Sequence, residues 1–187
     1  TSPADTEFTT EFTNGATLTK ATGTGKNWYL WVYATDSLGN VSKTISGAFY
    51  IDNTVPSVTF GTNGSTTWAK SQSTKVTVTD DSTLTDLKYV WTQSTTAPAD
   101  SSFTTTFTNG GTITKNTGTG NDWYLWIYAK DSAGNIKKIN SGAFYIDNTA
   151  PSSCTITGNP TAWAKSATLS VAGADANSGL ASSPYSW

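Results

Sequence analysis

Apolar and polar residues alternate over short runs along most of this chain, and clusters of turn residues separate the runs. The stretch KVTVT at Lys75–Thr79 places Val76 and Val78 on one face of an extended strand. Asp122–Lys130 is the longest alternating run, and it also has the aromatic and β-branched residues that favour strands. Gly, Asn, Asp and Ser fill the segments between such runs. The pattern therefore predicts an all-β protein.

Residues 55–149 illustrate the expected arrangement, because about seven strands are predicted there. They are Ser57–Gly61, Lys75–Thr79, Leu87–Thr92, Phe103–Thr108, Gly111–Lys115, Asp122–Lys130 and a last strand that ends in Ala143–Ile146. Asn109-Gly110 is a hairpin signal between two of them. Short strands with turns at intervals of about 8–12 residues are typical of an antiparallel β-sandwich.

The chain repeats itself with a period of 95 residues. When residues 1–57 are compared with residues 96–152, 40 of the 57 positions are identical without a gap. Further along, WAKS at 68–71 recurs at 163–166, and the inward pair Tyr89 and Trp91 recurs as Tyr185 and Trp187 after a one-residue insertion. Cys154 corresponds to Val58, which predicts a small buried apolar side chain. Self-similarity of this extent predicts a tandem array.

The phase of the repeat predicts where the units begin. Asn-Thr-X-Pro follows a strand-like run in both copies, so Pro56 and Pro151 fit the entry to a new unit. On that phase, residues 1–54 are the C-terminal half of one unit, 55–149 form a complete unit, and 150–187 are the N-terminal half of another. Each half would leave strand edges and apolar faces uncovered. Completion is expected from continuation of the polypeptide or from a second molecule.

Composition excludes several classes of function. The chain has no His, Met or Arg, 11 Lys, 13 acidic residues and a formal net charge of −2. These counts exclude a His-dependent catalytic or zinc site, and they give no basic surface for nucleic acid. No apolar run is long enough for membrane insertion, and Cys154 has no partner for an internal disulfide. We therefore expect a protein that is not an enzyme, and the low charge with many hydroxyl groups suits an extracellular or cell-surface location.

Three sets of residues resemble the bacterial immunoglobulin-like and fibronectin-type-III-like repeats of large surface proteins. They are the strand closing into AKDSAGN at 129–135, the motif FYIDNTAP at 144–151, and the aromatic pair Tyr89 and Trp91. The resemblance covers nearly the whole chain and implies tandem immunoglobulin-like sandwiches. Such modules are usually stalks, spacers, adhesin segments or accessory domains, and this chain departs from them in its density of aromatic residues.

The predicted outer faces of the long strands carry a row of aromatic side chains. Alternation puts Leu125 and Ile127 in the core and their neighbours on the opposite face. The row consists of Tyr29, Trp31, Tyr33 and Tyr50 in one copy and of Tyr124, Trp126, Tyr128 and Tyr145 in the other. Such a row suits contacts with a neighbouring repeat or a second chain, or stacking on sugar rings. The third alternative is that the chain's own loops cover it, such as the segments of Trp68 or Trp163.

Asp147 and Asn148, at the junction between units, are candidate ligands for Ca²⁺, with Asp80 or Asp81 nearby in the sequence pattern. The alternative is a turn in which these side chains cap backbone groups, with no cofactor at all.

The sequence as a whole predicts a structural, extracellular repeat module that forms a stalk or filament. Its expected partners are copies of itself or neighbouring repeats of the same polypeptide, assembled head to tail or by strand complementation. The alternative function is that of a carbohydrate-binding or adhesin module that uses the aromatic row.

Overall fold

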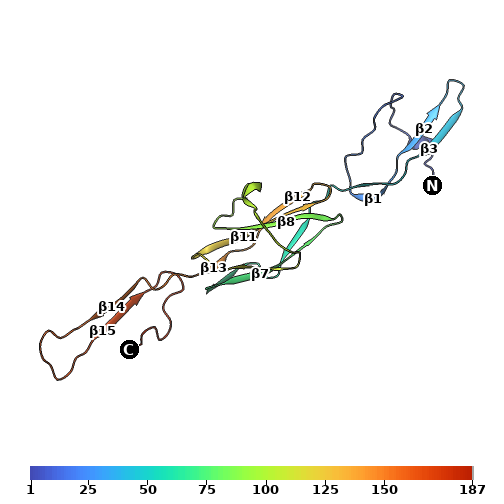
Figure 1. Ribbon diagram of the computed structural model, residues 1–187. Helices are drawn as coiled ribbons and strands as arrows, with labels where there is room; N and C mark the ends of the chain where they lie inside the picture. The colour runs from blue at the N-terminus through green and yellow to red at the C-terminus, as the bar shows by residue number, and fades with distance from the viewer. Residues whose placement is uncertain (187) are drawn as a thin grey trace.

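The computed structural model describes residues 1–186, and it consists mainly of β-strands and the turns between them (Figure 1). Strands make up 42% of the chain and helices 3%, which confirms the predicted all-β class. In the part described, the helices are two 3-10 turns, η1 (Asp5–Glu7) and η2 (Asp100–Ser102). Neither approaches the ~20 residues that a membrane-spanning helix needs. Trp187, expected to point inward with Tyr185, lies outside the described residues.

The strands gather into three groups that follow one another along an elongated molecule, with the two termini at opposite ends (Figure 1). We call these groups the N-terminal segment (residues 1–54), the middle segment (residues 55–149) and the C-terminal segment (residues 150–186). Each strand pairing among the described residues joins two strands of the same segment. The three groups are therefore connected in series and not woven into one sheet.

The middle segment holds nine strands. They are β5 (Ser57–Phe60), β6 (Ser65–Ala69), β7 (Gln72–Thr79), β8 (Leu84–Thr92), β9 (Thr105–Thr106), β10 (Thr112–Lys115), β11 (Gly120–Asp131), β12 (Ile136–Asn140) and β13 (Phe144–Ile146). One sheet has the order β10-β7-β5, and the other has the order β6-β13-β11-β8-β9 with β12 beside β11. All the pairings are antiparallel except that of β6 with β13.

Side chains from both of these sheets form one hydrophobic core. Val76 and Val78 of β7 pack with Ile113 of β10 and with Leu125 and Ile127 of β11, and all five are buried. Complete burial of an aliphatic side chain of this size contributes about 1.5–3 kcal/mol. The alternation of KVTVT thus points the two valines inward, as the sequence predicts.

The N-terminal segment contains β1 (Gly25–Trp28), β2 (Trp31–Thr35), β3 (Val41–Ile45) and β4 (Phe49–Ile51). β1 pairs with β4, and β2 pairs with β3. Every one of these pairings recurs 95 residues later, in the same register, between β11 and either β13 or β12. For example, Gly25 lies opposite Ile51 as Gly120 lies opposite Ile146, and Trp31 lies opposite Ile45 as Trp126 lies opposite Asn140.

The C-terminal segment contains two paired strands, β14 (Ser153–Thr157) and β15 (Ser170–Ala174). Cys154 lies opposite Gly173, as Val58 lies opposite Val78 in the pair formed by β5 and β7. The register thus places Cys154 at the position of Val58, as expected, although the 95-residue period alone would align Cys154 with Thr59, so β14 is displaced by one residue. The expected burial is wrong, because Cys154 is exposed. In the middle segment the side chains facing Val58 come from later strands, and the described part of the C-terminal segment holds no equivalent of them.

Several stretches form strands in the middle segment but not at the ends of the chain. Residues 10–11 and 17–20 correspond to β9 and β10, yet they are irregular, and so are residues 160–164, which correspond to β6. β9, β10 and β6 pair with β8, β7 and β13 respectively, and the end segments lack those partners. A strand needs a neighbour to satisfy its backbone groups, so the same sequence stays irregular without one.

Three details of the predicted strands are corrected. The strand expected at Phe103–Thr108 is only the two-residue β9, and β6 was not predicted at all. The expected last strand is divided into β12 and β13. Ser141 lies at the division, where its buried hydroxyl accepts a hydrogen bond from the backbone N–H of Leu125 at 3.0 Å.

Candidate functional site

The aromatic row of the middle segment lies on the face opposite the main core, as alternation predicts, but it is not open to solvent. Trp126 and Tyr128 are buried, at 5% and 8% exposure, under Phe103 from the loop that precedes β9. The rings of Phe103 and Tyr128 are 5.5 Å apart, and the Trp126 indole N–H donates to the carbonyl of Ser94 at 3.0 Å. The expectation that these two residues form an exposed contact surface is therefore wrong.

Tyr124 and Tyr145 are half-buried at the edges of this covered row. Tyr145 packs against Trp68 of β6, with ring centroids 5.0 Å apart. Of the three alternatives, coverage by the chain itself therefore describes the middle segment, with Phe103 from a loop and Trp68 from β6 as the covering residues. Trp163, the counterpart of Trp68, covers nothing and is fully exposed.

The first copy of the row is more open. Phe8 packs on Tyr33 at 5.4 Å, as Phe103 packs on Tyr128, and both Trp31 and Tyr33 are half-buried. Tyr29 is exposed, and Tyr50 is 74% exposed. Tyr50 corresponds to Tyr145, so it is bare because no tryptophan equivalent to Trp68 lies beside it.

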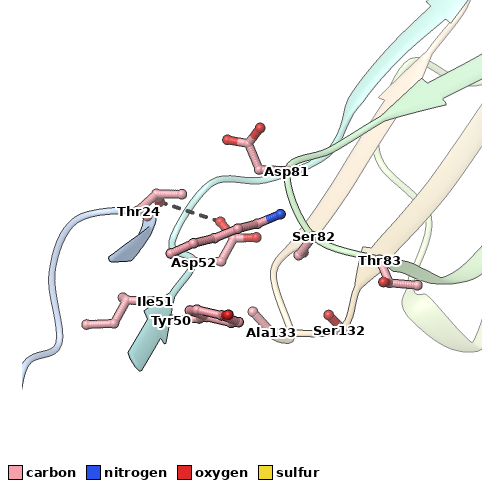
Figure 2. Close-up of a pocket in the computed structure, with 11 residues that line it drawn as sticks. Thr24, Tyr50, Ile51, Asp52, Asp81, Ser82, Thr83, Ser132 and Ala133 are labelled. Carbon is pink, nitrogen blue, oxygen red and sulfur yellow. Dashed lines mark hydrogen bonds between the residues drawn. The ribbon is translucent and has the colours of Figure 1, made fainter. Parts of the chain in front are cut away.

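A pocket of about 820 Å³ lies where the N-terminal and middle segments meet (Figure 2). Residues 24–26 and 50–52 form one wall, and the turns at 81–83 and 132–133 form the other. The side-chain amide of Asn135 reaches across and donates to the carbonyl oxygen of Asp52 at 3.1 Å. Figure 2 shows Asp52 between Thr24 and Ser82, with Tyr50 below it. A direct hydrogen bond therefore joins the two segments at this junction.

Three carboxylates converge at this junction, those of Asp52, Asp80 and Asp131, and each offers an oxygen within 4.8 Å of the other two. The backbone N–H of Thr54, which donates at 2.9 Å, holds the pKa of Asp52 below its ordinary value, and the Ser82 hydroxyl adds to this effect. Asp131 is buried and accepts the backbone N–H groups of its own turn. Hard divalent cations take oxygen donors of this kind.

Sequence reasoning did not single out this group, because Asp52 and Asp80 are far apart in the chain and Asp131 reads as a turn residue. In the sequence, the signal for this group of carboxylates is that Asp52 recurs 95 residues later as Asp147.

The candidate calcium ligands Asp147 and Asn148 lie at the second junction. Asp147 accepts the backbone N–H of Ser178 at 3.0 Å and that of Thr149 at 2.9 Å. The Asn148 amide donates to the carbonyls of Lys70 and Gly118. These contacts are the backbone capping that was the alternative to a metal site, and calcium binding here stays a prediction.

Hydrogen bonds lower the pKa of Asp147 below its ordinary value. The Ser178 hydroxyl has the largest effect, followed by the backbone N–H of Thr149. Ser178 belongs to the C-terminal segment, so the charge of Asp147 contributes to the contact between two segments.

Comparison with known proteins gives no family assignment: no protein-family model and no curated protein matches the chain. The proposed function therefore rests on the strand pairings and contacts of the chain itself.

Proposed function

We propose that the chain is a mechanical spacer made of tandem immunoglobulin-like β-sandwich repeats of about 95 residues, working outside the cell as part of a stalk or filament. The single observation that carries this proposal is the recurrence of strand pairings. Those of β1–β4 return 95 residues later in β11–β13, in the same register and farther along the same elongated molecule (Figure 1).

The packing of the middle segment supports a sandwich as the repeating unit. Its two sheets share one core. Along β7, buried side chains that face this core alternate with exposed polar side chains. Two sheets that pack face to face over a shared core form a stable β-sandwich.

The junctions support a spacer more than a flexible string. Asn135 holds the carbonyl of Asp52 at the first junction, and Asp147 holds the backbone of Ser178 at the second. A direct hydrogen bond between successive segments restricts bending at each junction. Because the array resists bending, its end-to-end length increases with every added repeat.

The uncovered faces of the two end segments support assembly with adjoining strands. In a longer chain these strands come from the flanking repeats, and in an assembly of separate molecules they come from a partner. Both routes give the head-to-tail growth that a stalk or filament requires.

Small-angle scattering on the purified chain, at a concentration where light scattering gives a single monomeric mass, tests the spacer function. A compact domain of this length has a radius of gyration of about 16 Å. We expect a clearly larger value and a pair-distance distribution with the long tail of a rod. A symmetric distribution near the compact value contradicts the proposal.

One observation favours the alternative of an adhesin or carbohydrate-binding module, which is the exposure of Tyr29 and Tyr50. Exposed aromatic faces stack on the apolar faces of sugar rings. A pull-down with insoluble polysaccharides compares the natural chain with the double variant Tyr29→Ala/Tyr50→Ala. Binding that the variant loses supports this function, whereas equal binding or none at all ends it.

A further inference from the structure

The three carboxylates at the first junction, those of Asp52, Asp80 and Asp131, include oxygens that have no partner. Asp52 accepts the Thr54 N–H at 2.9 Å through Oδ1, and Asp80 accepts the Ser82 N–H at 2.8 Å through its own Oδ1. Among the described residues, the buried side-chain oxygens without a hydrogen-bond donor are the Oδ2 atoms of Asp52 and Asp80. A buried acceptor that stays unpaired is costly, so these two oxygens point to a ligand.

The ion pairs of the described residues do not neutralise these carboxylates. Those ion pairs involve the acids Asp5, Asp86 and Asp100, none of which belongs to the group. Lys26 lines the adjoining pocket but forms no ion pair with the group. Since buried charges in proteins are paired or coordinate metals, a cation from solution is the remaining counter-charge.

A proton shared between two carboxyl groups is a poorer solution at neutral pH. Ser82 donates both its N–H and its hydroxyl to Asp80, each at 2.8 Å. Asp131 accepts the N–H groups of Gly134 and Asn135. Hydrogen bonds from such donors favour the ionised form of a carboxyl group, so the group keeps its negative charge.

We propose that a calcium ion binds between Asp52, Asp80 and Asp131 and joins the N-terminal segment to the middle segment. The donors are oxygen atoms, which Ca²⁺ prefers, and each carboxylate offers one within 4.8 Å of the other two. Two oxygens bound to one Ca²⁺ at about 2.3–2.6 Å lie up to about 5 Å apart. For Mg²⁺, with bonds of about 2.0–2.1 Å, the limit is about 4 Å. Calcium therefore fits the whole of this range, and magnesium fits only part of it.

Water can complete the coordination of the ion. Asp131 is buried, whereas Asp52 lines the pocket of about 820 Å³ drawn in Figure 2. Ca²⁺ takes about six to eight oxygen ligands, so waters from this pocket would fill the positions that the carboxylates leave. The site adds a calcium dependence to the junction whatever the repeats are used for, and it does not rest on the spacer function.

The second junction closes the equivalent position with an amide. Asp147 corresponds to Asp52. The segment between Asp175 and the following tyrosine is one residue longer than the matching segment after Asp80. There Ser178 donates its N–H to Oδ2 of Asp147 at 3.0 Å, whereas Oδ2 of Asp52 has no donor. The unpaired oxygen is therefore particular to the first junction.

Isothermal titration of the full chain with calcium chloride, after chelator treatment, tests the proposal. We expect one site with a Kd of about 10⁻⁴–10⁻³ M, the range of extracellular calcium modules. Asp52→Asn and Asp80→Asn should each weaken binding at least about tenfold, because a charged ligand is lost. The matched control is Asp36→Asn. Asp36 is the counterpart of Asp131 and accepts the same turn N–H groups, but it belongs to no such group of carboxylates.

Amide resonances locate the ion without any substitution. The N–H groups of Thr54, Ser82 and Asn135 donate to the three carboxylates, so their resonances should shift as calcium is added. The resonances of Thr149 and Ser178, which surround Asp147, should stay in place. Circular dichroism of each variant verifies that its strands are intact, and the titration of the natural chain decides the matter if a variant does not fold.

Each other outcome overturns the proposal. A chain that binds no calcium up to about 10 mM has no such site. Binding that survives both substitutions, or that Asp36→Asn weakens equally, is attraction to acidic surface in general. Shifts confined to Thr149 and Ser178 place the ion at the second junction, and magnesium that binds as tightly as calcium contradicts the assignment of the ion. A rod-like scattering profile measured with chelator present leaves the spacer function standing in all of these cases.

Discussion

At the scale of single residues, Phe103 decides whether the aromatic row is surface or core. It is 3% exposed and shields Trp126 and Tyr128 from water. Its counterpart Phe8 makes the same contact with Tyr33, but there both rings stay partly solvated. The same pair of residues thus contributes differently to stability in the two copies.

Replacing Phe103 by Ala should therefore lower the free energy of unfolding by about 3–4 kcal/mol, because a buried aromatic ring is removed and a cavity remains. The emission of the tryptophans should also shift to longer wavelength as Trp126 becomes hydrated. Denaturant unfolding followed by fluorescence measures both effects. The control Phe8→Ala should cost clearly less, and equal losses in the two variants would contradict the covering role of Phe103.

At the scale of elements, the division between β12 and β13 depends on one hydroxyl group. Ser141 is 2% exposed, accepts the Leu125 N–H at 3.0 Å and donates to the Gly142 carbonyl at 2.8 Å. Without the Ser141 hydroxyl, the backbone N–H of Leu125 in the central strand β11 would have no hydrogen-bond acceptor, because the neighbouring strand is interrupted at this point.

The variant Ser141→Ala should lose about 1–3 kcal/mol of stability, which is the cost of leaving a buried donor unpaired. Ser46→Ala is a matched control, since Ser46 accepts the N–H of Leu30 at 2.9 Å in the same local geometry, but Ser46 is only half-buried and Leu30 is exposed. Water can replace that hydroxyl, so we expect a change within about 0.5 kcal/mol. Thermal unfolding of the two variants provides the comparison, and a similar cost in both would show that burial does not matter at this position.

At the scale of the whole molecule, the charge of Asp147 helps to join the middle and C-terminal segments. Its pKa is lower in the folded chain than the ordinary value of 3.8. The ionised carboxylate therefore stabilises the contact fully above the ordinary pKa, and this contribution is lost as the pH falls through the lower, folded value.

The contact should consequently be insensitive to pH between 7 and about 4 and should weaken only in stronger acid. Exchange of the Ser178 amide hydrogen, corrected for its intrinsic pH dependence, measures the opening of this contact. Asp147→Asn should show no acid-induced step in this range. Loosening that begins at pH 6 would exclude Asp147 as the group responsible.

The sequence by itself determined which side chains of the long strands face inward and which face outward. KVTVT and the run through Leu125 and Ile127 alternate at the period of a strand, and the 95-residue repeat fixed which positions correspond. Alternation also placed Trp126 and Tyr128 on the face opposite the main core. These are local properties, because the period of side chains along a strand depends only on backbone geometry.

The tertiary structure alone decided what covers each face. Phe103 lies 23 residues before Trp126 in the chain, so no local pattern announces that it buries the row. Tyr50 and Tyr145 occupy the same position of the repeat, yet only Tyr145 has a tryptophan against it. Burial and strand pairing depend on the partner that space provides, and the same residues are core in one segment and surface in another for that reason.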